Sequence, residues 1–196
     1  MQLRHRNLFL FFALAALVVA AVFWFRRTSP APAPALPAKR LDWGHATRAS
    51  GCRMNGPLPD PACTPGDILP ELTAGRICSP SFHTSDVRDT VTSPSEKRRV
   101  YEMYGVPHPA NNRGGSQVCE IDHLVSLELG GADTMANLWP QCSAGYAGWR
   151  EAGFRDKDRF ENYLHRQVCS GRLSLAEAQF QIASDWYHYW QEAGKP

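Results

Sequence analysis

Residues 8–25 form an unbroken run of 18 apolar residues, and arginines flank the run on both sides. A helix that spans a bilayer needs about 20 apolar residues, whereas the apolar core of a cleaved signal peptide is usually shorter. We therefore predict that residues 1–27 form a retained membrane anchor. The alternative is a cleaved signal peptide, for which Val19-Ala20-Ala21 offers a weak cleavage site.

Three composition changes divide the rest of the chain. Residues 28–40 alternate Ala and Pro, which favours an extended polyproline II spacer. Residues 41–80 carry three cysteines among many Gly and Pro, which predicts a loop-rich segment fastened by disulfides. Residues 81–196 then hold the main domain.

All six cysteines follow the apolar run: Cys52, Cys63, Cys78, Cys119, Cys142 and Cys169. An even number of cysteines outside an anchor is typical of an oxidising compartment and predicts up to three disulfides. Free thiols in a cytosolic domain are the alternative. Six cysteines allow 15 pairings, and the sequence does not choose among them. We expect at least one of the last three to be bonded, because they lie beside the polar segments considered below.

The overall charge excludes a uniformly basic nucleic-acid coat protein. Of 21 Lys and Arg, four lie in the first 27 residues, which leaves 17 against 19 Asp and Glu in the remainder. A polyanion would therefore have to meet a local basic patch or a metal ion.

Three helices are expected in the main domain. Residues 93–96 form a capping box with Pro94 at the first helical position, which predicts a helix to Tyr104. Phe160, Leu164 and Val168 recur every four residues and predict a helix over 156–169. A second capping box at residues 174–177 opens the final helix.

Two extended segments precede the second of these helices. Residues 117–129 mix β-branched and apolar residues and end at a glycine pair, and Pro140 favours a short extended piece over 137–140. Asp122 and His123 lie near the middle of the first segment. Neighbouring side chains on a strand point to opposite faces, so the two can share a site only where the strand ends or twists. A carboxylate there would suit a hard divalent cation, and a neutral histidine could take a proton from water.

The stretch from Asp122-His123 through Gly130-Gly131 to Asn137-Leu138 resembles the HNH, or ββα-metal, endonuclease family, including small exported bacterial proteins of this type. The resemblance implies an α+β fold in which a short β-hairpin and a helix form the core, with further helices beside it. It implies that His123 is the general base and that Asp122 binds the metal. It also implies that Asn137 either orients the loop or joins the metal.

The chain departs from the family pattern at the last histidine of the motif, which has no clear counterpart. His165, and after it Glu161, are the candidates for the remaining metal ligand, because they share a face of the expected helix. The resemblance implies Mg²⁺, with Mn²⁺ or Zn²⁺ as alternatives, and no dinucleotide cofactor. Arg150, Arg155 and Arg159 are the candidates for holding phosphates of the substrate.

Two functions are consistent with these observations. The first is a metal-dependent endonuclease, with DNA favoured over RNA, held at the bacterial inner membrane with its domain in the periplasm, or secreted if the leader is cleaved. The second is a non-catalytic envelope binding module on the same scaffold, which the lost histidine and the slightly acidic domain would suit.

Overall fold

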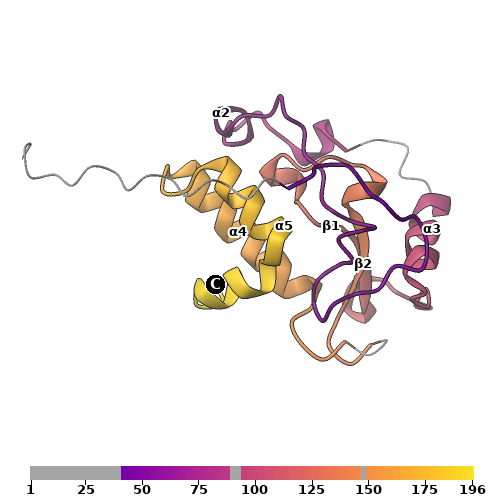
Figure 1. The fold of residues 1–196 in the computed structure, drawn as a ribbon. Coiled ribbons are helices and arrows are strands. Elements are labelled where there is room, and N and C mark those ends of the chain that lie inside the picture. Colours follow the sequence, from indigo (N-terminus) through magenta and orange to yellow (C-terminus); the bar gives the residue numbers. More distant parts are fainter. Residues whose placement is uncertain (1–40, 89–93, 147–148) are drawn as a thin grey trace, which may run out of the picture. The chain divides into compact units, whose positions relative to one another are not determined.

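The computed structural model describes residues 41–88, 94–146 and 149–196, which Figure 1 shows in colour. The expected anchor and the Ala/Pro spacer lie outside these residues. Within the described part, no helix combines the length and apolar character needed to cross a membrane. The described chain is a mixed structure of helices and one two-stranded antiparallel sheet.

The sheet pairs β1 (Cys119–His123) with β2 (Leu138–Cys142). In the register, Cys119 lies opposite Cys142 and His123 lies opposite Leu138. A disulfide joins Cys119 to Cys142 at one end of the pair. At the other end, the two strands are connected by residues 124–137, so β1 ends at His123, where the connection begins.

The expected extended segment over 117–129 is therefore too long at its C-terminal end. Beyond His123 the chain turns into a compact loop with two 3₁₀ turns, Leu127–Leu129 and Met135–Asn137. Inside the loop, the backbone N–H of Gly131 donates to the carbonyl of Ser126. A Cβ atom on Gly131 would lie 1.9 Å from the Val125 carbonyl oxygen, so only glycine fits there.

The three expected helices are confirmed, with small changes at their ends. They are α3 (Pro94–Tyr104), α4 (Phe154–Cys169) and α5 (Leu175–Glu192). The α4 helix begins two residues early because Asp156 accepts a hydrogen bond from the backbone N–H of Gly153 and caps the first turn. The α5 helix is interrupted at Asp185, whose carboxylate accepts from the N–H of His188 and restarts the helix.

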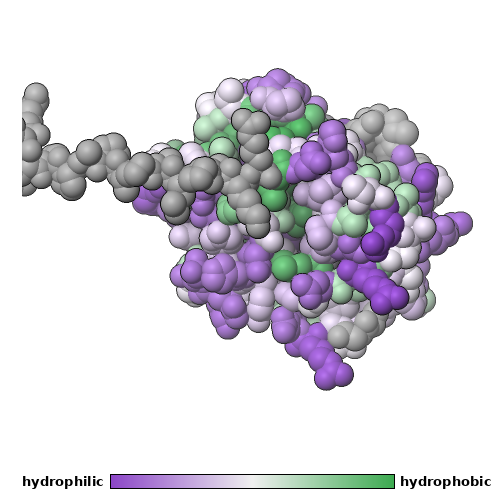
Figure 2. Space-filling view, viewed as in Figure 1, coloured by the Kyte–Doolittle hydropathy of each residue, from purple (hydrophilic) through white to green (hydrophobic). Residues whose placement is uncertain are grey.

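The hairpin lies between α3 and the α4–α5 pair in Figure 1. The predicted stripe on α4 is confirmed, since Phe160 and Leu164 are fully buried and Val168 is nearly so. Trp139 of β2 and Trp186 of α5 are also fully buried and join the same core. The face shown in Figure 2 is largely hydrophilic, with hydrophobic residues in scattered patches.

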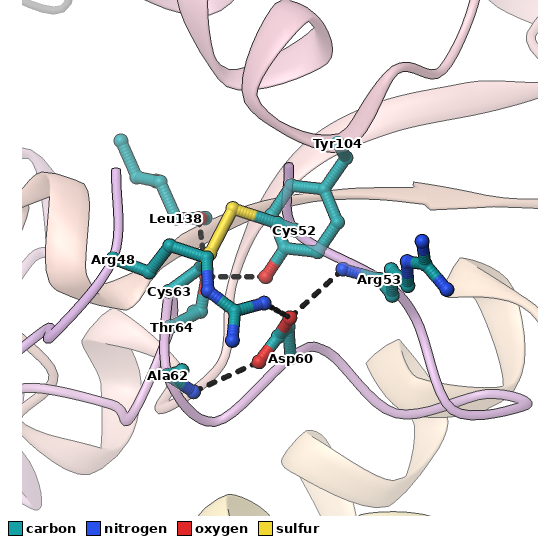
Figure 3. The surroundings of a disulfide bond; sticks show 9 residues. All are labelled: Arg48, Cys52, Arg53, Asp60, Ala62, Cys63, Thr64, Tyr104 and Leu138. Carbon is teal, nitrogen blue, oxygen red and sulfur yellow. Dashed lines mark hydrogen bonds and ion pairs between the residues drawn. A yellow bond between two sulfur atoms is a disulfide. The ribbon is translucent and has the colours of Figure 1, made fainter. Parts of the chain in front are cut away.

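The segment over 41–80 is loop-rich, as expected, apart from the single helical turn α2 (Ala74–Ile77). Figure 3 shows its disulfide Cys52–Cys63 beside buried Asp60. Thr64 ties this loop to the main domain by hydrogen bonds with the Tyr104 hydroxyl and the Leu138 carbonyl. The Asp60 carboxylate accepts from the Arg48 side chain and from the backbone N–H groups of Arg53 and Ala62.

All six cysteines are disulfide-bonded, as Cys52–Cys63, Cys78–Cys169 and Cys119–Cys142. The expected bond at Cys119, Cys142 or Cys169 is confirmed for all three. Cys78–Cys169 fastens the residue after α2 to the last residue of α4. Three disulfides without a free thiol indicate an oxidising compartment outside the cytoplasm.

We predict that Cys78–Cys169 contributes more to stability than Cys52–Cys63. The two bonds join residues 91 and 11 positions apart, and a longer closed loop removes more entropy from the unfolded chain. The double variant C78S/C169S should lose roughly 4–5 kcal/mol in urea unfolding, against roughly 3 kcal/mol for C52S/C63S. An unfolding midpoint of C78S/C169S equal to that of the wild type would contradict this account.

Candidate functional site

A cavity of about 1170 Å³ opens at the end of β1. Its walls come from the segment after the 3₁₀ turn Thr84–Asp86, from α3, from residues 108–113, from β1, from the 124–137 loop and from α4. The charged and ionisable side chains that line it include Arg88, Lys97, Arg113, Glu120, Asp122, His123, Glu128, Asp158 and Glu161.

Asp122 and His123 both line this cavity because the strand ends there. His123 is the last residue of β1, and its backbone N–H donates to the Asp122 carboxylate at 2.8 Å. Both residues line one cavity, as do the other residues of β1. Their side chains nevertheless have different partners, His123 in the 124–137 loop and Asp122 on α4.

His123 forms a buried pair with Asp133. The Nε2 atom of His123 lies 2.8 Å from a carboxylate oxygen of Asp133, and the side chains are 9% and 2% exposed. A carboxylate only accepts hydrogen bonds, so Nε2 carries the hydrogen and Nδ1 keeps its lone pair. Burial lowers the pKa of His123 more than the neighbouring carboxylates raise it, and Arg88 lowers it further. The ring is therefore neutral near pH 7 and able to accept a proton.

The ammonium group of Lys157 joins α4 to the end of β1. Lys157 is fully buried and donates to Asp122 at 2.7 Å, to the His123 carbonyl at 2.6 Å and to Glu161. Burial alone would lower the pKa of Lys157, but the carboxylates of Asp122 and Glu161 outweigh burial and raise it. The lysine is therefore charged, and its three donors are all used.

The cavity holds more carboxylates than this one buried cation can balance. Burial raises the pKa of Glu120 to about 8, and the nearby carboxylates of Asp122 and Asp158 add to the shift. Burial likewise raises the pKa values of Glu128, Asp158 and Glu161. Burial and the neighbouring carboxylates thus disfavour the charged forms of these groups, and a bound cation would stabilise those charged forms.

The donor set of the cavity fits a hard divalent ion. Carboxylate oxygens are the ligands that Mg²⁺ and Mn²⁺ prefer, and Mg²⁺ commonly keeps several waters while one or two carboxylates hold it. Asp122 and Glu161, both predicted ligands, line the same cavity with Glu120 and Asp158. No three of these four carboxylates bring ligand atoms within 4.8 Å of one another, so one or two of them would hold the ion and water would complete its shell.

A second group of metal-ligating atoms lies at the far end of α4. Among the described residues, only Cys78, His165 and Cys169 place three such atoms within 4.8 Å of one another. The two sulfurs are joined in a disulfide, so they could bind a metal only after reduction. His165, the first candidate for the remaining ligand, therefore lies beside this disulfide, 3.3 Å from the Ile77 carbonyl, and does not line the cavity.

Asn137 holds the loop and does not face the cavity. It is fully buried, and its amide oxygen accepts from the N–H groups of Val125 at 2.9 Å and Asp67 at 3.3 Å. Its amide nitrogen donates to the carbonyls of Val125 and Ala132. Two roles were considered for Asn137, orienting the loop and binding the metal. This arrangement corresponds to the first, because no amide atom is left for a metal.

The three arginines expected to hold substrate phosphates do not line the cavity. Arg150 and Arg155 are exposed, and Arg155 stacks over the Phe154 ring. Arg159 pairs with Asp156 on its own helix. The cations on the cavity wall are instead Arg88, Lys97 and Arg113.

Sequence reasoning missed three residues of this site: Glu120, Asp133 and Lys157. Lys157 had a usable signal, since it precedes Phe160 by three residues and so falls on the apolar stripe of α4. A lysine on a buried stripe requires a carboxylate partner. Glu120 lies two residues before Asp122, on the same face of the strand. Asp133 carried no local signal, because its contact with His123 depends on the path of the loop.

Comparisons of the chain with protein-family models, with curated proteins and with solved structures found no match. The resemblance to HNH endonucleases therefore remains a prediction from the motif, and the function is argued below from the geometry of the cavity.

Replacing Asn137 with Ala should destabilise the domain by about 3 kcal/mol, because each buried backbone group left without a partner costs roughly 1–3 kcal/mol. Asn137→Asp should also destabilise it, since a carboxylate oxygen would face the carbonyls of Val125 and Ala132. Exposed Asn162, which bonds within α4, is the control. Equal urea midpoints for N137A and N162A would refute the loop-holding role.

The metal-free domain should lose stability between about pH 6.5 and pH 8. The pKa of Glu120 is about 8 in the folded state against 4.5 for the free group, so the folded state binds more protons in this range. The free energy of unfolding therefore falls as pH rises. The lowered pKa of His123 acts in the opposite direction, but only below its ordinary value of 6.5.

Unfolding measured with a chelator at several pH values tests this expectation. Glu120→Gln should reduce the fall of the unfolding free energy with pH. Glu102→Gln, on the exposed side of α3, should leave that fall unchanged. A fall of the same size in E120Q and wild type would show that Glu120 is not its source.

Proposed function

We propose that this protein is a metal-dependent nuclease that hydrolyses phosphodiester bonds at the cavity beside His123. The observation that carries the proposal is the His123–Asp133 pair at the edge of an acidic cavity. A neutral, oriented imidazole next to a cluster of carboxylates is the combination that water activation and phosphate chemistry require.

His123 is the general base in this proposal. Its Nδ1 atom accepts a proton from the attacking water, and the Asp133 carboxylate, at 2.8 Å from Nε2, stabilises the resulting imidazolium. Burial of both side chains keeps the ring in one orientation. Asp133 acts through His123 and is a positioning residue.

Asp122 and Glu161 hold the metal in this proposal, with Glu120 and Asp158 beside them. When bound, a divalent ion supplies Lewis acidity at the phosphate and stabilises the leaving oxygen. Lys157 fixes one oxygen of Asp122 and one of Glu161, and the His123 N–H fixes the other oxygen of Asp122. Each of these oxygens keeps a second lone pair for the ion. The three disulfides support a reaction outside the cytoplasm, and the expected anchor at residues 1–27 would hold the protein at the membrane.

Purified full-length protein in a mild detergent should cleave DNA, supplied both as plasmid and as a single-stranded oligonucleotide, with Mg²⁺ or Mn²⁺ and stop when the ion is chelated. His123→Ala should reduce the rate by roughly 10²–10⁴-fold. Asp133→Asn should reduce it less and shift the pH profile, because the imidazolium loses its partner. His188→Ala removes an exposed histidine on α5 and should be neutral.

Two results would contradict the proposal. One is equal activity of wild type and H123A. The other is a wild-type protein that binds no divalent ion by calorimetry, which would favour the non-catalytic binding module.

A further inference from the structure

One wall of the cavity is basic. Arg88, Lys97 and Arg113 line it and come from three separate parts of the chain: the segment after the turn Thr84–Asp86, the first turn of α3, and the loop before the 3₁₀ turn Gly114–Ser116. All three side chains are exposed, and no ion pair within the described part of the chain uses them. They are therefore available to a ligand.

The acidic side chains of the cavity are recessed. The side chain of His123 is 9% exposed, and those of Asp122 and Glu161 are each 12% exposed. A phosphate must therefore enter the cavity to reach His123. The cavity volume of about 1170 Å³ also exceeds the roughly 300–1,000 Å³ typical of small-molecule pockets.

We propose that the cavity binds a single strand of nucleic acid, with Arg88, Lys97 and Arg113 holding its phosphates while one phosphodiester lies at His123. This inference rests on the proposed nuclease function and specifies its substrate. A DNA duplex is a stiff cylinder with its phosphates on the outside. It cannot enter the recess to bring a phosphate to His123. A single strand is flexible enough to enter.

Arg88 lines the same cavity as His123. Its charge is one of the influences that lower the pKa of His123, which places the guanidinium within electrostatic reach of the imidazole. Lys97 and Arg113 also line the cavity and would hold neighbouring phosphates of the strand. Arg98 and Arg99 follow Lys97 on α3 but do not line the cavity.

Fluorescence anisotropy tests the inference. The probe is a labelled oligonucleotide, single-stranded or paired with its complement, mixed with full-length H123A protein and Ca²⁺ so that no cleavage intervenes. The single strand should bind at least tenfold more tightly than the duplex. Lys97→Ala should weaken binding about fivefold and lower the slope of log K against log salt by about 0.7, as expected for one lost phosphate contact.

Arg88→Ala and Arg113→Ala should behave like Lys97→Ala, while Arg98→Ala is the matched control and should bind as tightly as the parent protein. Equal affinity for duplex and single strand would overturn the inference, and so would equal affinities of K97A and R98A. Because binding is measured without catalysis, the two proposals can fail separately. If the wild type binds the single strand but cleaves nothing, only the nuclease proposal fails. If it cleaves but K97A, R88A and R113A bind as tightly as the parent protein, only the single-strand inference fails.

Discussion

The buried ammonium of Lys157 is the interaction on which the site depends. It joins α4 to the end of β1 through Asp122, Glu161 and the His123 carbonyl, and these contacts fix the side of the cavity where the carboxylates gather. Removing one partner of such a buried network typically costs 3–5 kcal/mol, because the remaining charges are left unpaired. The position of His123 therefore follows from a charge interaction, and the apolar core around Phe160 and Leu164 holds the helix that supplies it.

The same interaction explains the chemistry proposed for the cavity. Burial raises the pKa values of Glu120, Glu128, Asp158 and Glu161, Glu120 to about 8, and repulsion from neighbouring carboxylates, which Lys157 only partly offsets, adds to the rise. A divalent ion would relieve this repulsion. It would also let a polyanion approach a wall that is otherwise negative, while Arg88, Lys97 and Arg113 attract the strand from the other side. In this account the acidic side chains bind the metal ion and the basic side chains bind the phosphates of the strand.

The sequence predicted the features that depend on neighbours along the chain. Capping boxes and the spacing of Phe160, Leu164 and Val168 located the helices. The Asp122-His123 pair was expected near the middle of an extended segment, whereas β1 ends at His123. Features that depend on distant segments were missed. Asp133 reaches His123 only because Asn137 folds the intervening loop, and the cysteine pairing depends on where α2 meets α4. Arg150, Arg155 and Arg159 were expected to bind phosphates and lie just before or on α4, whereas the cations that line the cavity come from three segments that only the fold brings together.

Diffraction from crystals soaked in Mn²⁺, recorded at the manganese absorption edge, tests the central claim most directly. The account predicts an anomalous peak inside the cavity, in contact with carboxylate oxygens of Asp122 or Glu161, and a weaker peak in the same place for Asp158→Asn. A strong peak elsewhere with none in the cavity would contradict the account, since the acidic wall would then have no cation to bring a phosphate to His123.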